Sequence, residues 1–244
     1  MRKTISQILF GTLIVSLISG LTTIQAKNTT KEQTMKIAVL AASGKAGKLI
    51  VEEAINKGLE VSAFVRDSKK AQFDSRVHVV QKDIFKLESN DLEGFDVIVD
   101  AFGEWQNLSL HKAHIEHLVQ ILAGNSAKFL VVGGAGSLYM DKKHTVMFMD
   151  TPDFPQEYIP VAKATAEVLE VLRPNNKINW VYVSPPAVFI PDAPKSGKYK
   201  ITGEEFELNS KGESKISYAD YAAAMLDIAL DSTYSKQRVG VIGE

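Results

Sequence analysis

The sequence contains no cysteine among its 244 residues, and this absence excludes several kinds of chemistry. Without a thiol, the chain forms no disulfide, offers no thiolate nucleophile and holds no iron–sulfur cluster. A lipid anchor attached to cysteine is excluded as well. The composition is therefore compatible with both a reducing and an oxidising compartment.

An excess of charge of one sign is also lacking. The chain has 28 Lys and Arg against 29 Asp and Glu, and its hydrophobic share of 45% is ordinary for a soluble globular protein. Nucleic-acid-binding domains carry a basic excess, so no nucleic-acid partner is predicted. After the N-terminal segment no apolar run is long enough to span a bilayer, so no membrane contact is predicted beyond a leader.

Residues 1–26 have the pattern of a secretory signal peptide. Two basic residues precede an apolar stretch at residues 8–21, and Ala26 ends a small-residue cleavage site. Residues 27–34 then form a polar linker. The pattern predicts a secreted or extracytoplasmic protein. The alternatives are an uncleaved anchor and, if translation starts at Met35, a cytoplasmic protein.

A glycine turn joins an apolar strand at residues 37–40 to a helix. Gly44 lets the backbone approach a bound group, and Gly47 lets the helix pack against the sheet. The amides at the helix start face outward as an anion site that suits a pyrophosphate. Ala41 replaces the first glycine of the usual G-x-x-G-x-x-G spacing, and a purely structural turn is the alternative. The cofactor contacts predicted here are Ala41, Ser43, Gly44, Lys45, Ala46 and Gly47.

The end of the next predicted strand indicates which nicotinamide cofactor is bound. In a dinucleotide-binding fold this position, about twenty residues beyond the turn, meets the adenosine ribose. An acidic residue there favours NAD, but this chain has Arg66, with Lys69 and Lys70 close behind. A guanidinium suits a 2′-phosphate, so NADP(H) is predicted in preference to NAD(H). A solvated basic loop is the alternative.

From Met35 onward, strand and helix patterns alternate without an internal repeat. This order predicts an α/β fold with a Rossmann-type, doubly wound and mostly parallel sheet, in one domain at residues 35–244. Residues 186–217 are expected to form a small, irregular lobe that covers the substrate. Strands are expected at 60–66, 77–81, 96–101, 128–132, 178–183 and 238–242, and helices at 68–73, 108–122, 161–172 and from Ser217 onward.

The strand ends supply further predicted contacts, because ligands of such sheets settle at the carboxyl ends of the strands. Asp83 is placed to accept from an adenine amino group while Ile84 covers the ring, and a helix cap is the alternative for Asp83. Gly103 permits close approach to the ribose and phosphate. The other predicted cofactor contacts are Ala101, Phe102, Gly133, Gly134 and Pro185.

Three histidines lie on the helix expected at residues 108–122. His111, His114 and His117 are spaced by three, so they drift around the helix and do not converge on one metal. No metal site is predicted. His114 is expected to be a partly buried structural residue, with a pocket-facing role as the alternative.

The order of motifs resembles that of a known family. The segments that carry the resemblance are residues 41–47, 64–67, 100–103, 131–137, 180–186 and 215–221. Together they resemble the atypical short-chain dehydrogenase/reductase superfamily. Within it they resemble the group provisionally named NAD(P)H-flavin reductases, relatives of biliverdin-IXβ reductase and of NmrA-like proteins. The resemblance spans nearly everything after Met35.

The chain departs from this family at the catalytic pair. Short-chain dehydrogenases use Tyr-x-x-x-Lys on the helix after the fifth strand. Here Lys163 matches the lysine, but Ile159 stands in the tyrosine position and Tyr158 is one residue early. The predicted catalytic residues are therefore Lys163, which is expected to hold a ribose or to be an ordinary surface lysine, and the hydroxyls of Ser137 and Tyr139.

The displaced tyrosine favours an acceptor that needs little help from a protein acid. Ketone reduction benefits by ~10²–10⁴-fold from general acid catalysis. A conjugated acceptor such as a flavin spreads the charge, and stacking and orientation then supply most of the rate enhancement. The chain offers material for a planar slot, and residues 141–160 are apolar enough to form a lid. The slot residues expected are Phe102, Trp105, Leu138, Tyr139, Pro185 and Phe189.

The sequence thus predicts an NADPH-dependent reductase that transfers hydride to a flavin or another planar acceptor, with the flavin as substrate rather than bound cofactor. Two alternatives remain open. One is an NADP(H)-binding redox sensor without turnover, which the NmrA-like resemblance implies. The other is a sugar-nucleotide epimerase or dehydratase, which the displaced tyrosine and the small C-terminal lobe disfavour.

Overall fold

A computed structural model describes residues 34–244, which form one compact unit. The predicted signal peptide at residues 1–26 and all but the last residue of the predicted linker lie outside the described residues. Within residues 34–244, no helix is both long enough and apolar enough to cross a membrane.

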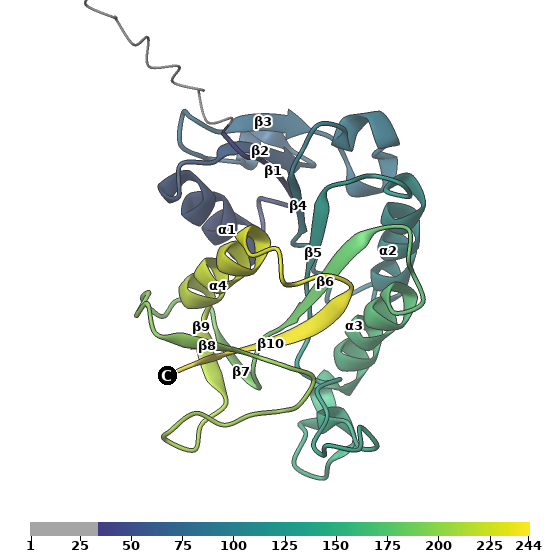
Figure 1. The fold of residues 1–244 in the computed structure, drawn as a ribbon, viewed down its shortest axis with the longest axis vertical. Helices are drawn as coiled ribbons and strands as arrows, with labels where there is room; N and C mark the ends of the chain where they lie inside the picture. Colours follow the sequence, from purple (N-terminus) through teal and green to yellow (C-terminus); the bar gives the residue numbers. More distant parts are fainter. Residues whose placement is uncertain (1–33) are drawn as a thin grey trace, which may run out of the picture. The chain divides into compact units, whose positions relative to one another are not determined.

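An eight-stranded sheet forms the centre of this unit (Figure 1). Its spatial order is β3-β2-β1-β4-β5-β6-β10-β8, and every neighbouring pair is parallel except β10 and β8. The predicted Rossmann-type, mostly parallel sheet is therefore confirmed. The strand order reverses between β1 and β4, where such sheets bind dinucleotides. The strands are β1 (Lys36–Leu40), β2 (Glu60–Val65), β3 (His78–Gln81), β4 (Val97–Asp100), β5 (Lys128–Val132), β6 (Asn179–Ser184), β8 (Tyr199–Thr202) and β10 (Gln237–Gly243).

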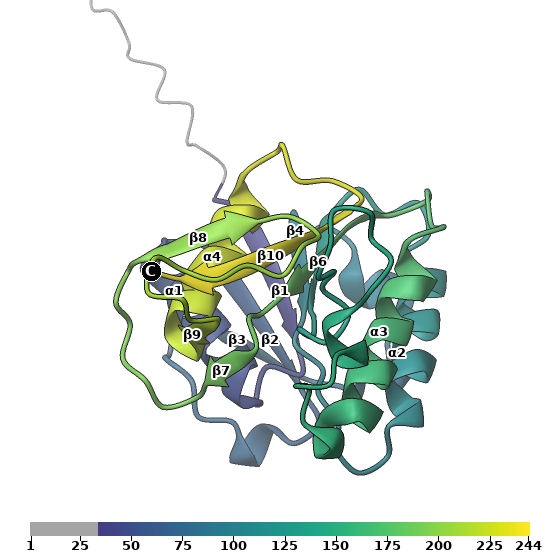
Figure 2. The same ribbon diagram turned by 90° about the horizontal axis from the view of Figure 1, so that it is seen from below.

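Four helices cover the two faces of the sheet (Figure 2). One face packs against α1 (Lys45–Asn56) and α4 (Tyr218–Leu230), and the other against α2 (Ser109–Ile121) and α3 (Ile159–Leu172). Because both faces are covered, the central strands are apolar along their length rather than alternating. All four residues of β4 are buried, for example. The continuous apolar runs in the sequence therefore predict the strands well.

The C-terminal lobe is more regular than the sequence predicts. Residues 186–217 contain β7 (Val188–Ile190), which pairs in parallel with β9 (Lys215–Ser217), and they also contain β8 of the main sheet. These strands are only three or four residues long, so they leave a weak sequence pattern. The helix predicted at residues 68–73 is likewise reduced to one turn of 3₁₀ helix at Ser68–Lys70.

Residues 141–160 are folded against the body of the protein rather than over an opening. The Phe148 and Met149 amides donate to the carbonyls of Leu138 and Gly136. Just before this segment, Tyr139 accepts at its carbonyl from the Phe206 amide, which joins the loop to the chain between β8 and β9. The lid predicted from the apolar residues of this segment is not seen, because Phe148 packs on Phe154 and Phe206 and no residue of 141–160 lines the cleft described below.

Candidate functional site

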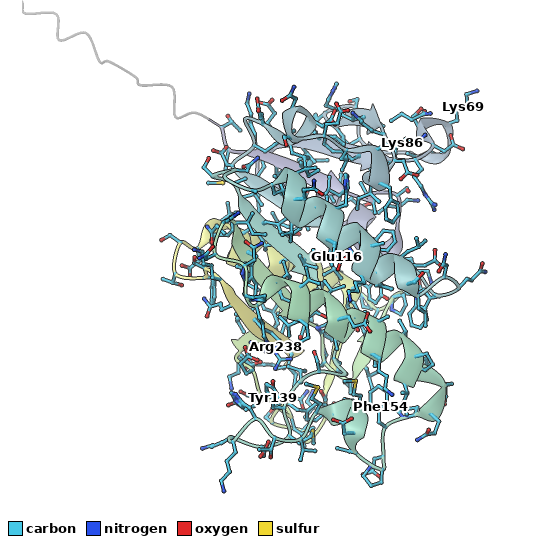
Figure 3. The ribbon with its side chains drawn as sticks, turned by 90° about the vertical axis from the view of Figure 1, so that its right-hand side faces the viewer. Lys69, Lys86, Glu116, Tyr139, Phe154 and Arg238 are labelled. Carbon is cyan, nitrogen blue, oxygen red and sulfur yellow. The ribbon has the colours of Figure 1, made fainter. Side chains whose placement is uncertain are left out.

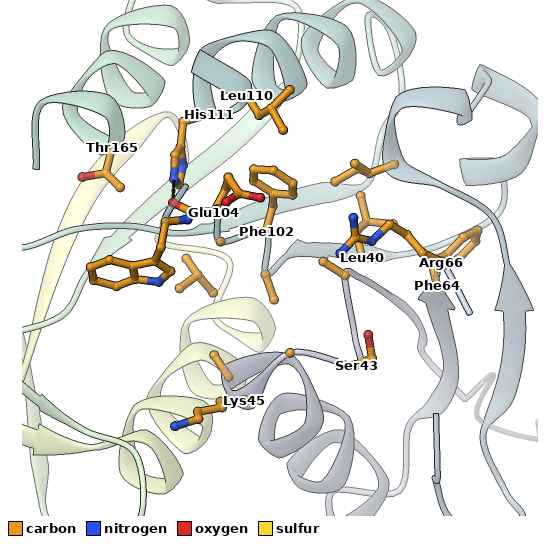
Figure 4. Close-up of a pocket in the computed structure, with 18 of the residues that line it drawn as sticks. Leu40, Ser43, Lys45, Phe64, Arg66, Phe102, Glu104, Leu110, His111 and Thr165 are labelled. Atoms are coloured by element: carbon orange, nitrogen blue, oxygen red, sulfur yellow. Dashed lines mark hydrogen bonds between the residues drawn. The ribbon is translucent and has the colours of Figure 1, made fainter. Parts of the chain in front are cut away.

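A cleft of about 860 Å³ runs along the carboxyl ends of the parallel strands (Figure 4). Its walls follow the order of the sheet. The ends of β2 and β3 form one end of the cleft, the β1–α1 turn and the segment after β4 form its middle, and α3, α4 and the segments after β5 and β6 form the other end. The lining residues are Leu40, Ala41, Ser43, Gly44, Lys45, Ala46, Phe64, Arg66, Lys82, Asp83, Ile84, Phe85, Leu87, Ala101, Phe102, Gly103, Glu104, Trp105, Leu110, His111, Val132, Gly133, Val161, Thr165, Phe189 and Tyr218.

The β1–α1 turn presents the positive end of a helix to the cleft. Gly44 caps α1 in an extended conformation, and no side chain bonds the free amides of the first turn. No acidic residue stands in that turn either. Unpaired amides and the helix dipole together attract an anion. The turn therefore has the chemistry to hold a pyrophosphate.

Close packing explains the residue types in this turn. A Cβ atom on Gly47 would lie 2.8 Å from the Cα of Ala42, so only glycine lets α1 sit this close to the strand end. Gly47 is accordingly buried behind the cleft and does not line it. Ala41, in the position of the missing glycine, has a φ of 52° and accepts from the Gly44 amide at 3.1 Å. The turn thus keeps its left-handed residue without a glycine, at a cost of about 1 kcal/mol.

Basic and apolar side chains form the end of the cleft at β2 and β3. Arg66 is exposed, and within residues 34–244 no hydrogen bond or ion pair holds its guanidinium. Lys82 is already engaged by Asp91 at 2.6 Å. Asp83 accepts from the Phe85 amide at 2.9 Å as the cap of a 3₁₀ turn, which agrees with the alternative reading of this residue. Arg66 is therefore the cation best placed for a ligand at this end.

A buried ion pair lies beneath the middle of the cleft. His114 Nε2 contacts Asp100 Oδ2 at 2.9 Å, and both side chains are almost fully buried. The other carboxylate oxygen accepts from the Phe102 amide, and the Phe102 ring stacks on His114 with 4.2 Å between ring centres. Burial alone would lower the pKa of His114, but the Asp100 carboxylate raises it above its ordinary value. The pair therefore fixes the turn that lines the cleft after β4.

His111 anchors the next part of the same segment. Its Nε2 donates to the Glu104 carbonyl at 2.8 Å, and burial lowers its pKa, so the ring is neutral near pH 7. The Glu104 carboxylate accepts from the amides of Gln106, Trp105 and, more weakly, Asn107, which lowers its own pKa. This turn presents Trp105 with 68% of its surface exposed at the rim of the cleft.

The end of the cleft near β5 and β6 is lined by aromatic and small side chains. Trp105 contacts Tyr158 edge to face, with 6.3 Å between ring centres. Gly133 lines the cleft, and a Cβ atom on it would collide with the Tyr182 ring, so this position accepts only glycine. The other lining residues at this end are Val132, Val161, Thr165, Phe189 and Tyr218.

Sequence reasoning does not name Val161, Thr165 and Tyr218 as site residues. Val161 and Thr165 stand about one helical turn apart on α3, so they lie on the same face of the helix. If one of them were known to line the cleft, the other could be predicted to do so. Tyr218 gives no comparable local signal, because it reads as the first residue of an ordinary capped helix.

Most predicted cofactor contacts line the cleft, but three of them do not. Gly134 is turned away, since its amide donates to the Tyr182 hydroxyl at 2.8 Å. Pro185 is buried outside the lining, as is Gly47. The predicted contacts that do line the cleft are Ala41, Ser43, Gly44, Lys45, Ala46, Arg66, Asp83, Ile84, Ala101, Phe102, Gly103 and Gly133.

The three predicted catalytic residues also lie outside the cleft lining. Ser137 is 3% exposed, and its carbonyl and hydroxyl both accept from Arg238. Tyr139 stacks on His144 and lies under Arg238, near the end of the molecule opposite Lys69 and Lys86 (Figure 3). Lys163 is exposed on α3. Ser137 and Tyr139 do not line the cleft, because the loop after β5 bends towards β10, where Arg238 engages it. The exposure of Lys163 agrees with its alternative interpretation as a surface lysine.

Each histidine of α2 has its own partner, and they do not face a common point. His117 Nε2 donates to the Leu87 carbonyl, whereas His111 and His114 contact Glu104 and Asp100. Among the residues that the structure describes, no group of three or more His, Asp or Glu side chains is placed to hold a metal ion.

Comparisons with known proteins agree with the fold. YwnB, an uncharacterized protein of Bacillus subtilis, is 41% identical over 212 residues, which cover 86% of this chain and 99% of YwnB. A Streptococcus pneumoniae protein provisionally named NADH-flavin reductase has a crystal structure with a TM-score of 0.82 and 48% identity, covering 86% of this chain and all of that one. A Bacteroides thetaiotaomicron protein provisionally named an epimerase reaches 0.76 at 28% identity, covering 86% and 98%.

The residues that form the β1–α1 turn and the cleft fall almost entirely within a match to one protein family. Its profile covers residues 41–232, which is most of the chain, and the family is described by the binding of NAD(P)H. The chain belongs to this NAD(P)H-binding family.

Proposed function

We propose that the protein is an NADPH-dependent oxidoreductase that transfers hydride to a flavin or another planar conjugated acceptor. The observation that carries this proposal is a single cleft with two different ends. An anion-binding turn and Arg66 suit a phosphorylated dinucleotide, and the far end is lined by aromatic and small side chains that suit a flat ring.

The family resemblance and the comparisons support the nicotinamide half of the proposal. The relative from Streptococcus pneumoniae carries the name of an NADH-flavin reductase. Bound in this cleft, the reduced nicotinamide would supply the hydride. The α1 amides would hold its pyrophosphate, and Gly133, Phe102, Trp105 and Phe189 would line the site of the nicotinamide and of the acceptor.

The preference for NADPH rests on Arg66. Its guanidinium lines the cleft at the end where the adenosine ribose is expected. Among the described residues no hydrogen bond or ion pair engages it, and the Glu104 carboxylate only attracts it through space. A 2′-phosphate would give it a bidentate partner. The other basic residue lining this end, Lys82, is held by Asp91.

The direct test mixes the purified protein with NADPH and one acceptor at a time. The acceptors are FMN, FAD and a soluble quinone, and loss of absorbance at the nicotinamide band reports turnover. NADPH oxidation that depends on both protein and acceptor supports the proposal. A flat trace with every acceptor contradicts it.

A second candidate is an NADP(H)-binding sensor that regulates a partner without turnover. The exposed position of Lys163 and the absence of tyrosine at position 159 favour it, because the usual catalytic pair is not assembled. Tight cofactor binding without oxidation, together with a partner whose capture depends on the cofactor redox state, would distinguish this function from the first. An epimerase or dehydratase would instead convert a sugar nucleotide without net oxidation of added NADPH.

We also propose that the protein acts outside the cytoplasm after removal of residues 1–26. The basic start, apolar core and small-residue end of this segment support the proposal. The N-terminal residue of the mature protein tests it. Lys27 supports export, whereas Met35 would indicate translation from an internal start.

A further inference from the structure

Tyr218 lies at the aromatic end of the cleft, and the reduction proposed above gives it no role. It is the first residue of α4 and is half-buried in the cleft lining. The same end is lined by Gly133 from the segment after β5 and by Thr165 from α3. Tyr218 is therefore placed on the side of the cleft where the acceptor is expected rather than on the phosphate side.

The position of the Tyr218 ring is fixed by its surroundings. The preceding residue, Ser217, caps α4 by accepting from the Asp220 amide at 2.9 Å, and its hydroxyl donates to the Asp220 carboxylate at 2.8 Å. The Tyr218 ring packs on Phe189 with 3.7 Å between ring centres, and Phe189 also contacts Tyr221. A capped helix and a stacked neighbour thus hold the phenol in one direction.

The hydroxyl of Tyr218 differs from those of three neighbouring tyrosines. Tyr182 donates to the Thr165 carbonyl, Tyr221 to the Val183 carbonyl and Tyr199 to Asp227. Within residues 34–244, no hydrogen bond engages the Tyr218 hydroxyl. Partly buried polar groups are normally paired, and unpaired ones in a cleft are candidates for contact with a ligand.

The Tyr218 phenol also carries its proton at neutral pH. Burial raises its pKa above the ordinary value for tyrosine, and no nearby charge opposes the effect. When a conjugated ring accepts a hydride, the displaced electron pair moves to a carbonyl oxygen or a ring nitrogen of the acceptor. That atom then needs a proton, and a positioned phenol supplies one more readily than bulk water does.

We propose that Tyr218 is a catalytic residue that hydrogen-bonds the planar acceptor and gives it the proton that accompanies hydride transfer. The proposal rests on the function proposed above. The phenol O–H bond breaks as an O–H or N–H bond forms on the acceptor, and water then returns a proton to the phenolate. The hydride comes from reduced nicotinamide, so one hydride and one proton reduce the acceptor by two electrons.

The test compares Tyr218→Phe, which removes one oxygen atom, with Tyr234→Phe. Tyr234 packs against the core and does not line the cleft, so it controls for loss of any phenol. The first readout needs no turnover: FMN is titrated into the NADP⁺-bound protein and its fluorescence followed. We expect Tyr218→Phe to weaken FMN by about 5-fold, the effect of one lost hydrogen bond, with unchanged NADP⁺ affinity.

The second readout is turnover. We expect kcat for FMN reduction to fall by about 100-fold in Tyr218→Phe, at the lower end of general acid contributions, and to stay at the wild-type value in Tyr234→Phe. The loss should be smaller with a quinone that carries electron-withdrawing groups, because its reduced anion needs a proton less. If Tyr218 had a purely structural role, Tyr218→Phe would lower the rates of FMN reduction and of quinone reduction by the same factor.

The outcomes separate the two proposals. If the wild type turns over and Tyr218→Phe matches it in FMN affinity and kcat, the role of Tyr218 is overturned and the proposed function stands. If none of the acceptors supports NADPH oxidation by the wild type, the proposed function and the role of Tyr218 fall together.

Discussion

The middle of the cleft and its aromatic end are built from the chain in different ways. The β1–α1 turn in the middle comes from one contiguous stretch, Leu40–Ala46, whereas the aromatic end collects residues from five separate regions. Trp105, Gly133, Thr165 and Tyr218 are brought together only by the order of the sheet and its helices. A local turn can therefore be recognised as a motif, and a site assembled from distant positions cannot.

The largest effect on stability is expected at the buried Asp100–His114 pair, which lies beneath the middle of the cleft. Removing one partner of a buried pair leaves the other charge uncompensated, so His114→Leu should lower the free energy of unfolding by about 3–5 kcal/mol. His117→Leu, which loses only a contact with the Leu87 carbonyl, is the control and should cost less. Urea unfolding of both variants measures the difference.

This prediction has a pH dependence with a definite sign. The folded-state pKa of His114 lies above its unfolded value, so the stability that its charge contributes is fully present below about pH 6.5 and is lost as the pH rises through the folded-state pKa. The deficit of His114→Leu relative to the wild type should therefore be larger at acidic pH than at alkaline pH. An equal deficit at both would show that His114 carries no additional charge in the folded protein.

The next largest effect is expected in the β1–α1 turn, which is proposed to bind the pyrophosphate. Gly47→Ala places a Cβ against the backbone of Ala41 and Ala42, so α1 must shift, which should cost about 1–3 kcal/mol and weaken NADPH binding. Gly44→Ala is the matched control for stability, because its Cβ would meet only the Ala41 carbonyl at 3.4 Å. Thermal unfolding measures the stability of both variants, and calorimetry measures their affinity for NADPH. Equal melting temperatures would contradict the packing role of Gly47.

Arg66, at the β2–β3 end of the cleft, is expected to favour NADPH over NADH. Arg66→Ala should weaken NADPH by about 10–100-fold, as expected for a lost hydrogen bond to a charged group, and NADH by much less. Lys69→Ala, a nearby exposed lysine outside the cleft lining, should leave both affinities nearly unchanged. An equal loss for NADPH and NADH in Arg66→Ala would show that the guanidinium does not select the 2′-phosphate.

The smallest effect is expected at Lys163. Because its side chain is exposed and does not line the cleft, Lys163→Ala should leave the NADPH affinity and the rate of acceptor reduction within about two-fold of the wild type. Initial rates and calorimetry measure both. A large loss of rate would return Lys163 to the catalytic role that its place in the sequence predicts.

The sequence predicts the fold in more detail than the site, for a physical reason. Buried parallel strands such as β4 require unbroken apolar runs, and these are visible in the chain. The loop after β5 has no such constraint. Its glycines suggest contact with a ligand, but Gly136 packs on Ala162 and Ser137 bonds Arg238, a residue about one hundred positions away. Long-range partners of this kind leave no local pattern.

Strand β10 has a consequence for how the protein is made. It lies inside the sheet, between β6 and β8, and its Arg238 bonds both Ser137 and the Glu204 carbonyl. Strand β8 is synthesised about 35 residues before this partner and has no neighbour in the sheet until β10 arrives. A ribosome-bound chain that stops short of residue 237 thus keeps an open sheet edge.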